Sequence, residues 1–203
     1  MTLIIGISGR KQSGKNTVNN FINGTIMVKQ GMIDNFFLGE KGELVIHNDT
    51  KNYGVFDVTR KDDAFVDYAE KELWPYIKTY HFADTLKSMC VNVFGLSPKN
   101  IYGTDKQKNA PTPFTWADMP DNPRPNELNV KVTHREFMEH FGTKIVRKIK
   151  KNSWVYETMN RIMGEGSELA IMPDVRFPNE VEAIKDNGGI VIRLTRKIDD
   201  SQA

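Results

Sequence analysis

The chain has 203 residues, enough to bury one substantial hydrophobic core and carry an insertion, so we expect a single domain over 1–203 rather than two. Its 28 Lys and Arg nearly balance its 26 Asp and Glu, and a net charge of +2 argues against general electrostatic binding to nucleic acid or to a membrane surface. The single cysteine, Cys90, excludes an internal disulfide and is expected to fill the core, which fits a reducing, cytoplasmic compartment.

The N-terminal residues predict a buried strand, a glycine-rich turn and a helix, in that order. The apolar run of residues 3–7 is typical of a strand buried on both faces of a parallel sheet, and it is too short for a signal peptide or a membrane span. After the turn, Val18, Phe21 and Ile22 recur at helical spacing. This is the order that a phosphate-binding unit requires.

The next stretch, about residues 25–75, is the candidate insertion. Residues 43–48 and 53–58 alternate or are β-branched around the polar residues 49–52, which predicts a hairpin. Further elements follow in chain order: a helix over 64–73 closed by Pro75, a strand ending near Phe82, and a helix over 85–94 that stops at Gly95.

After Pro98, the segment 98–131 carries five further prolines and no sustained period, so we expect it to be irregular and either functional or mobile. Thr133 and Glu136 then form a capping box at a helix start. Apolar residues at four-residue spacing predict that this helix continues, and lysines favoured by the helix dipole gather at its far end. The apolar positions are Phe137, Phe141, Ile145 and Ile149, and the lysines are Lys148, Lys150 and Lys151. With the irregular segment, this helix makes a probable lid region of about 98–152.

The C-terminal third alternates strand, helix and strand. Residues 169–172 form an apolar run that leads into Asp174, as a central strand delivers a carboxylate to the carboxyl edge of a sheet. A helix over 179–186 and a strand over 190–194 follow. The whole pattern predicts an α/β, three-layer fold with a mostly parallel central sheet and helices on both faces.

Residues 9–17 match the phosphate loop G-x-x-x-x-G-K. Its backbone N–H groups would surround phosphate oxygens, and Lys15 would neutralise the β and γ phosphates. The structural alternative is a tight glycine turn with a surface lysine. Asn16 replaces the hydroxyl that usually holds Mg²⁺, so the ion would be held through Asn16 itself or by Thr17 or the carboxylate of Asp174 through water. Lysine, any residue, then threonine is the form of nucleotide kinases such as adenylate kinase, which favours a small-molecule kinase.

Several arginines could screen a phosphate-to-phosphate transfer, in which charge spreads over the transferring oxygens. Arg176 lies two residues after Asp174 on the same side of an extended backbone, although the pair could be a strand-end salt bridge only. Arg135 and Arg147 lie on the capped helix, where a solvated face is the plainer interpretation. No general base is required, because a phosphate acceptor has a second pKa of about 6.

Residues after the second predicted strand could meet a nucleoside acceptor. Phe82, Asp84 and Lys87 supply an aromatic ring, a carboxylate and an ammonium group, although a buried phenylalanine beside a helix-capping aspartate explains the first two equally well. We place Lys11 of the phosphate loop on the acceptor side as well. The histidines show no metal-ligand spacing.

Four strings together resemble the deoxynucleoside monophosphate kinases of tailed bacteriophages, over nearly the whole chain. They are Gly9-x-x-x-Ser13-Gly14-Lys15-x-Thr17, Phe82-Ala83-Asp84-x-Leu86-Lys87, Arg135 with Gly142-Thr143 and Trp154, and Asp174-Val175-Arg176-Phe177-Pro178-Asn179-Glu180. The last string is the most specific and the first the most general. Asn16 departs from the expected Asp, and the chain ends soon after its last strand, where a further segment over adenine is expected.

The resemblance implies a P-loop fold with a mobile lid, ATP as phosphoryl donor, Mg²⁺, and a deoxynucleoside monophosphate as acceptor in phage DNA precursor synthesis. It implies that Lys15 and Thr17 bind ATP, that Arg135 and Arg176 bind the transferring phosphates, that Glu180 supports Arg176, and that Phe82, Asp84 and Trp154 line the acceptor side. Taken with the motifs above, the predicted ATP-binding residues are Gly9, Ser13, Gly14, Lys15, Asn16, Thr17 and Arg147, and the predicted catalytic residues are Lys15, Arg135, Asp174 and Arg176. The predicted acceptor residues are Lys11, Phe82, Asp84, Lys87, Trp154 and Glu180. A homodimer is left open, and the location would be the cytoplasm, that of the infected host if the gene is a phage gene.

Three other functions stay open at this stage. A P-loop kinase of another small phosphate, such as dephospho-coenzyme A, would share the loop and differ in its acceptor pocket. An ATP-driven nucleic-acid module is disfavoured by the balanced charge and the lack of a basic stripe with interleaved aromatics. A nucleotide-binding regulator would bind ATP without turnover.

Overall fold

The structure is a computed structural model and describes residues 2–47 and 53–195. The chain divides into two compact units. The first is formed by Met1–His81 with Thr158–Ala203, and the second by Phe82–Glu157. In the described part of the chain, no helix combines the length and the apolar character needed to cross a membrane.

The first unit is built on a four-stranded sheet in the order β5-β8-β1-β9. All three strand pairs are parallel, which confirms the predicted α/β fold with a mostly parallel central sheet. The strands are β1 (Leu3–Gly9), β5 (Ile77–Thr79), β8 (Leu169–Val175) and β9 (Ile190–Leu194). Because the strands are parallel, their carboxyl ends meet at one edge of the sheet.

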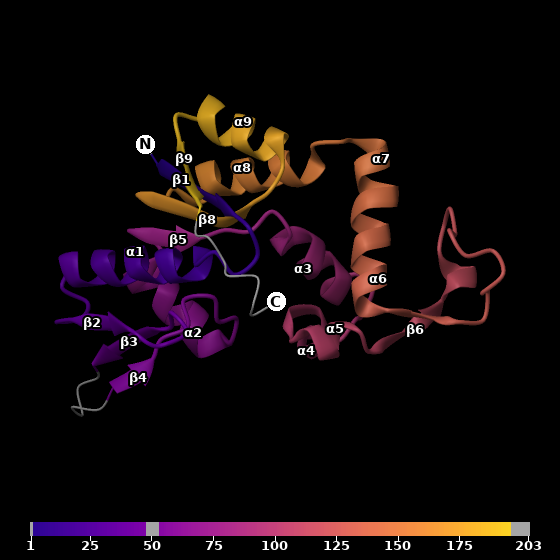
Figure 1. Cartoon of the computed structure of the whole chain (residues 1–203), viewed down its shortest axis with the longest axis horizontal. Coiled ribbons are helices and arrows are strands. Elements are labelled where there is room, and N and C mark those ends of the chain that lie inside the picture. Colours follow the sequence, from indigo (N-terminus) through magenta and orange to yellow (C-terminus); the bar gives the residue numbers. More distant parts are fainter. Residues whose placement is uncertain (1, 48–52, 196–203) are drawn as a thin grey trace. The chain divides into compact units, whose positions relative to one another are not determined.

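Helices cover both faces of this sheet (Figure 1). Helix α1 (Lys15–Lys29) lies on one face, where its Met27 joins Ile7 and Ile171 in a fully buried cluster. Helix α9 (Pro178–Asp186) lies on the other face, where Ile184 contacts Gly6 of β1. The part of α8 (Ser153–Glu165) from Thr158 onward lies on the same side as α9. Burial on both faces explains why the central strands β1 and β8 begin as continuous apolar runs rather than alternating ones.

The candidate insertion forms a second sheet in the first unit. Strands β3 (Leu44–His47) and β4 (Tyr53–Val55) pair antiparallel, which confirms the predicted hairpin, although its turn at 49–52 lies outside the described residues. A third strand, β2 (Phe36–Leu38), pairs with β3 and was not predicted. The predicted helix over 64–73 is confirmed as α2 (Asp63–Tyr68) followed by a π-helical turn, Ala69–Leu73.

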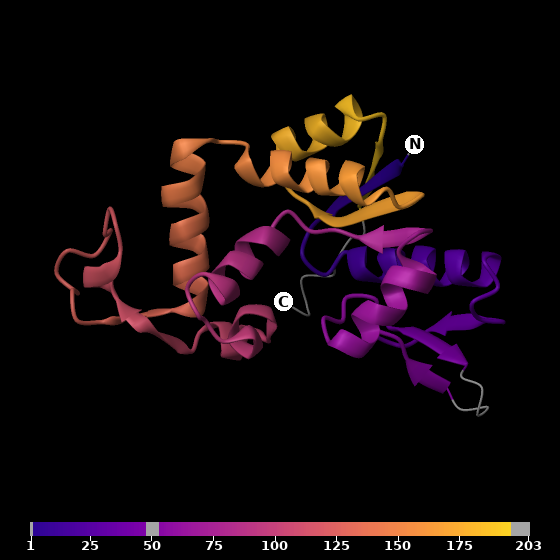
Figure 2. The same ribbon diagram turned by 180° about the vertical axis from the view of Figure 1, so that it is seen from behind.

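The second unit is mainly helical. Its long helix runs without a break through α6 (His134–Glu139), a π-helical stretch (His140–Val146) and α7 (Arg147–Ile149), as Figure 2 shows from behind. The other elements are α3 (Asp84–Asn92), α4 (Pro98–Tyr102), α5 (Asp105–Lys108), β6 (Pro111–Thr115), a 3₁₀ turn (Trp116–Asp118) and β7 (Lys131–Thr133). Phe94, Phe137 and Phe141 pack together in the core with the buried Cys90, as expected for that residue.

Two predictions about this unit were wrong. The segment 98–131 is not irregular throughout, because it contains α4, α5 and β6, which pairs antiparallel with β7. These helices are too short to show a period, and the prolines of β6 are tolerated because each strand of a two-stranded sheet is an edge strand. Ile149 does not continue the buried stripe of the long helix: it is 84% exposed at the last helical residue.

Candidate active site

The glycine-rich loop joins β1 to α1, as predicted. Gly14 caps the helix with φ of +93°, a left-handed conformation that favours glycine, and its carbonyl accepts the N–H of Val18 at 3.0 Å. The ammonium group of Lys15 folds back and donates to the carbonyls of Gly9 (2.9 Å) and Arg10 (2.8 Å). Lys15 therefore already lies over the loop, where its ammonium group can donate hydrogen bonds to phosphate oxygens in place of these carbonyls.

The hydroxyl of Ser13 is a buried polar group inside this loop. Ser13 is 6% exposed, and its Oγ has no hydrogen-bond partner within the described residues. An unsatisfied buried hydroxyl typically costs about 1–3 kcal/mol. A phosphate oxygen held by the loop could offset that cost, so the orphaned hydroxyl fits an anionic ligand.

The predicted carboxylate and arginine lie at the carboxyl end of the strand beside the loop. Val175 of β8 pairs with Ser8 of β1, and Asp174 and Arg176 flank Val175. Arg176 donates Nε–H and Nη2–H to the two oxygens of Asp174, at 2.8 and 2.6 Å. These hydrogen bonds raise the pKa of Arg176 above its usual value, so it stays charged. The arrangement brings a fixed cation and a carboxylate to the loop edge of the sheet.

Glu180 supports this strand end through the backbone. It is 3% exposed, and its carboxylate accepts the N–H groups of Arg176 (2.7 Å) and Phe177 (3.0 Å) at the start of α9. A carboxylate here also suits the positive end of the helix. Glu180 therefore fixes the backbone from which the Arg176 side chain extends.

The remaining loop residues differ in what they contact. Asn16 and Lys11 are exposed. Thr17 contacts the turn before β3, since a Cβ placed on Gly42 would lie 2.1 Å from the Thr17 Oγ1. Across residues 2–47 and 53–195, no group of three or more His, Cys, Asp or Glu side chains could hold a metal ion. One carboxylate, Asp174, nevertheless fits Mg²⁺, which keeps most of its water shell and binds one or two carboxylates together with substrate phosphates.

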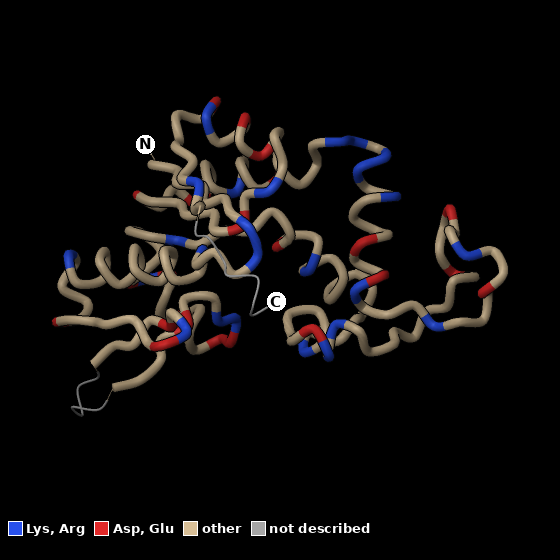
Figure 3. Tube along the Cα trace, viewed as in Figure 1, with Lys and Arg blue, Asp and Glu red and all other residues tan. Residues whose placement is uncertain are grey.

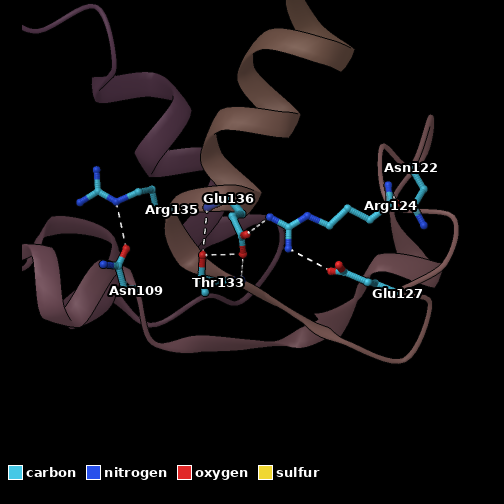
Figure 4. A network of polar contacts seen from close by, with 7 residues as sticks. All are labelled: Asn109, Asn122, Arg124, Glu127, Thr133, Arg135 and Glu136. Atoms are coloured by element: carbon cyan, nitrogen blue, oxygen red, sulfur yellow. Dashed lines mark hydrogen bonds and ion pairs between the residues drawn. The ribbon is translucent and has the colours of Figure 1, made fainter.

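The other predicted site residues belong to the second unit. Arg135 at the start of α6 donates Nε–H to Asn109 Oδ1 at 3.0 Å (Figure 4). It also donates Nη2–H to Asp105 Oδ1 at 2.7 Å. Arg147 opens α7 and is partly buried. Trp154 is 6% exposed and donates its indole N–H to the carbonyl of Gly142 at 3.1 Å, so its ring presents little surface to a ligand.

The acceptor candidates Phe82, Asp84 and Lys87 lie around the start of α3 in the second unit and are partly buried. The ammonium of Lys87 lies 5.5 Å from the centre of the Tyr102 ring of α4. Asp84 is the first residue of α3 rather than its cap, which is Ala83. This group therefore combines a cation, a carboxylate and a half-exposed aromatic ring within one unit.

Sequence reasoning missed a buried polar network behind the phosphate loop. Asn19 and Asn23 of α1 are 4% and 1% exposed. The Thr79 hydroxyl at the end of β5 donates to Asn19 Oδ1 (3.1 Å), and Asn23 Nδ2 donates to the Asn19 carbonyl (2.9 Å) and side-chain oxygen (3.2 Å). Two asparagines four residues apart on the buried face of a helix are the pattern that could have revealed it. The network ties the helix that carries Lys15 to the sheet.

A strand, a phosphate loop that opens a helix and a carboxylate at the end of the neighbouring parallel strand together define a P-loop kinase fold. Within that class, the chain belongs to the deoxynucleotide monophosphate kinase family, whose sequence model matches residues 3–202. A protein of Acanthamoeba polyphaga mimivirus that bears the provisional name of deoxynucleotide monophosphate kinase is 28% identical over 127 residues. That match covers 57% of this chain and 58% of the viral protein. Family membership confirms the resemblance inferred from the four sequence strings.

Proposed function

We propose that the protein transfers the γ-phosphoryl group of ATP to a deoxynucleoside monophosphate, forming a deoxynucleoside diphosphate and ADP. One observation carries the proposal: the phosphate loop and the Asp174–Arg176 pair share one edge of the sheet, because Ser8 pairs with Val175. Membership of the deoxynucleotide monophosphate kinase family supports the choice of acceptor. The setting would be DNA precursor synthesis, in the cytoplasm of an infected host if the gene is a phage gene.

On the ATP side, Lys15 exchanges its two loop carbonyls for β- and γ-phosphate oxygens. This exchange is favourable because phosphate oxygens carry negative charge, which attracts the ammonium group more strongly than a neutral carbonyl oxygen does. The loop N–H groups and the positive end of α1 hold the rest of the triphosphate. The further ATP contacts in this proposal are those of Gly9, Ser13, Gly14, Asn16, Thr17 and Arg147.

In this proposal Asp174 and Thr17 would hold Mg²⁺ through water. When bound, the ion neutralises charge on the β and γ phosphates. Both oxygens of Asp174 already accept hydrogen bonds from Arg176. Its carboxylate can accept further hydrogen bonds from metal-bound water without releasing the arginine, because each oxygen has two lone pairs.

Arg176 and Arg135 screen the charge of the transferring group. No protein base removes a proton from the acceptor, because its phosphate has a second pKa of about 6 and is largely dianionic at neutral pH. Glu180 holds the backbone of Arg176. The proposed acceptor contacts are those of Lys11, Phe82, Asp84 and Lys87, together with the small exposed parts of Trp154 (6%) and Glu180 (3%). The self-association of the protein as a homodimer is a separate prediction, which light scattering after gel filtration would test.

The test is ADP formation from Mg-ATP with each common deoxynucleoside and ribonucleoside monophosphate in turn. The variant Lys15→Ala exposes any contaminating kinase, and Lys29→Ala is the matched control, an exposed lysine at the other end of α1. We expect turnover with at least one deoxynucleoside monophosphate, lost in Lys15→Ala and kept in Lys29→Ala. ATP binding without turnover on any of these acceptors would contradict the proposal. Screening dephospho-coenzyme A and related phosphates would then separate another kinase from a regulator.

A further inference from the structure

The guanidinium group of Arg135 is held along one edge only. Its Nε–H and one Nη2–H are taken by Asn109 and Asp105, two residues of the α5 region. Among the described residues, its other three N–H groups, two on Nη1 and one on Nη2, have no hydrogen-bond partner. One Nη1–H and the second Nη2–H point along the end of the guanidinium, and such a pair is one of the two ways in which arginine binds a phosphate through paired hydrogen bonds.

The α5 region is built so that its two contacts are fixed. Thr104 caps α5 through a reciprocal capping box with Gln107, which sets the position of Asp105 in the first turn. The corner before it requires a glycine, because a Cβ on Gly103 would lie 2.2 Å from the carbonyl oxygen of Lys99. Asn109 is the C-cap of the same helix. Both partners of Arg135 therefore come from one short, tightly capped element.

The contacts of Arg135 with Asp105 and Asn109 contribute little to the free energy of folding. The side chain of Asp105 is 76% exposed and that of Arg135 is 39% exposed. Ion pairs this open to water contribute little to folding. What the contacts do change is the orientation of a long, flexible side chain, whose rotamer entropy otherwise opposes binding in one geometry.

We propose that Asp105 and Asn109 are positioning residues for Arg135: they hold its Nε and Nη2 so that Nη1 and the second Nη2 proton are offered to a substrate phosphate. The inference rests on the proposed function, because it takes Arg135 as a group that binds phosphate during transfer. It parallels the first unit, where Asp174 holds Nε and Nη2 of Arg176, and the same end of that guanidinium has no hydrogen-bond partner in the part of the chain that the structure describes.

Three changes at two positions separate geometry from charge. Asp105→Ala removes both the charge and the acceptor, whereas Asp105→Asn keeps an acceptor oxygen and removes the charge. Asn109→Ala removes the contact to Nε. The matched control is Asp121→Ala, which breaks another exposed ion pair of the same unit, that with Lys148 at 2.6 Å. Thermal unfolding of each variant checks that the fold is kept.

We expect Asp105→Ala to lower kcat by about tenfold to a hundredfold, the loss typical of a misplaced catalytic group. The KM for the deoxynucleoside monophosphate should change much less, since the charge of Arg135 remains. Asp105→Asn should lose less than Asp105→Ala, and Asp121→Ala should match the wild type. In an Arg135→Ala background, Asp105→Ala should cause no further loss.

Two kinetic results would overturn the inference while leaving the proposed function intact. One is an Asp105→Ala variant as active as Asp121→Ala although Arg135→Ala is impaired. The other is a lower KM with unchanged kcat in Asp105→Ala, which would mean that Asp105 competes with phosphate for Arg135. A fully active Arg135→Ala would remove the role of Arg135 and the inference with it.

A second readout does not depend on turnover. Arginine side-chain NMR, with the Arg135 resonances assigned by their loss in Arg135→Lys, should show slow rotation of the guanidinium in the wild type and fast rotation in Asp105→Ala. Titration with a deoxynucleoside monophosphate should shift the Nη1 protons first. Fast rotation in the wild type would refute the positioning role even if the enzyme were inactive on every acceptor tried, in which case the proposed function would fail separately.

Discussion

Gly6 in the middle of β1 tests how tightly the sheet under the active site is packed. An added Cβ at this position would lie 2.7 Å from Cδ1 of Ile184, 3.0 Å from Cγ2 of Val175 and 3.3 Å from Cγ2 of Val191. Cδ1 of Ile184 is the nearest of these atoms, and the two valines limit the space beside it because their χ1 rotation is restricted. Gly6→Ala therefore forces an overpacked contact, which typically costs about 1–3 kcal/mol. The reduced entropy of the unfolded chain returns about 0.4–1 kcal/mol, so we expect a net destabilisation of about 1–2 kcal/mol.

The control is Ile184→Val, which removes Cδ1, the atom nearest to the added Cβ at Gly6. By itself it should cost about 0.5–1.5 kcal/mol as a small cavity. Combined with Gly6→Ala, it should be less harmful than the sum of the two, by a coupling energy of about 0.5–3 kcal/mol for residues in direct contact. Urea unfolding followed by circular dichroism measures all four free energies. Since Val175 lies between Asp174 and Arg176, kcat of Gly6→Ala should fall as well.

The reasoning would be refuted by a Gly6→Ala variant as stable as the wild type. It would also fail if the two changes were additive, because the contact with Ile184 would then not be what limits the space at Gly6.

Three further predictions concern single side chains. Arg176→Ala should lower kcat about a hundredfold to a thousandfold, as for loss of a transition-state donor, and should raise the KM for ATP far less. The control Arg60→Ala, which breaks a similar ion pair with Asp62, should leave turnover unchanged, and equal turnover in the two variants would contradict the prediction. Burial acts to raise the pKa of Glu165, but the hydrogen bond to Lys78 helps to lower this pKa overall. The ionised Glu165 therefore stabilises the fold above the unfolded pKa of about 4.3, and this stabilisation is lost as pH falls through the lower folded pKa. Glu165→Gln should therefore lose about 1–2 kcal/mol at pH 7 in urea unfolding, and a loss as large at pH 3 would count against it. Burial raises the pKa of Cys90 to about 11, so alkylation at pH 8 should be about two hundred times slower than in urea from the smaller thiolate fraction alone; comparable rates would show that the thiol is accessible.

The parts of the fold that could be predicted from the sequence are those with a local physical cause. A strand of four apolar residues before a glycine-rich loop, the capping box at Thr133 and the acid at the end of β8 all depend on near neighbours in the chain. The structure confirms each of them. The two-stranded β6–β7 pairing has no such cause, because Pro111 pairs with Thr133, which is far along the chain.

The same distinction applies to the candidate site. Arg135 could be proposed because a capped helix of known start carries it, but its partners Asp105 and Asn109 precede it by 30 and 26 residues. Nothing local in the α5 sequence marks them as arginine partners. The charged groups of this region are spread among many others along the tube in Figure 3, so charge alone does not single them out.

A held arginine edge does not by itself identify a phosphate-binding residue. Arg60 donates Nε–H and Nη2–H to Asp62, both at 2.8 Å, with the same two-residue spacing as Arg176 and Asp174. That pair lies before α2, and Asp62 also caps this helix by accepting the N–H of Phe65. Arg176 differs in its surroundings, since its strand end is paired with the strand that delivers the phosphate loop. For Arg135 the surroundings include no such loop within its own unit, so its role depends on the kinetic coupling between Asp105 and Arg135, which a purely structural ion pair would not show.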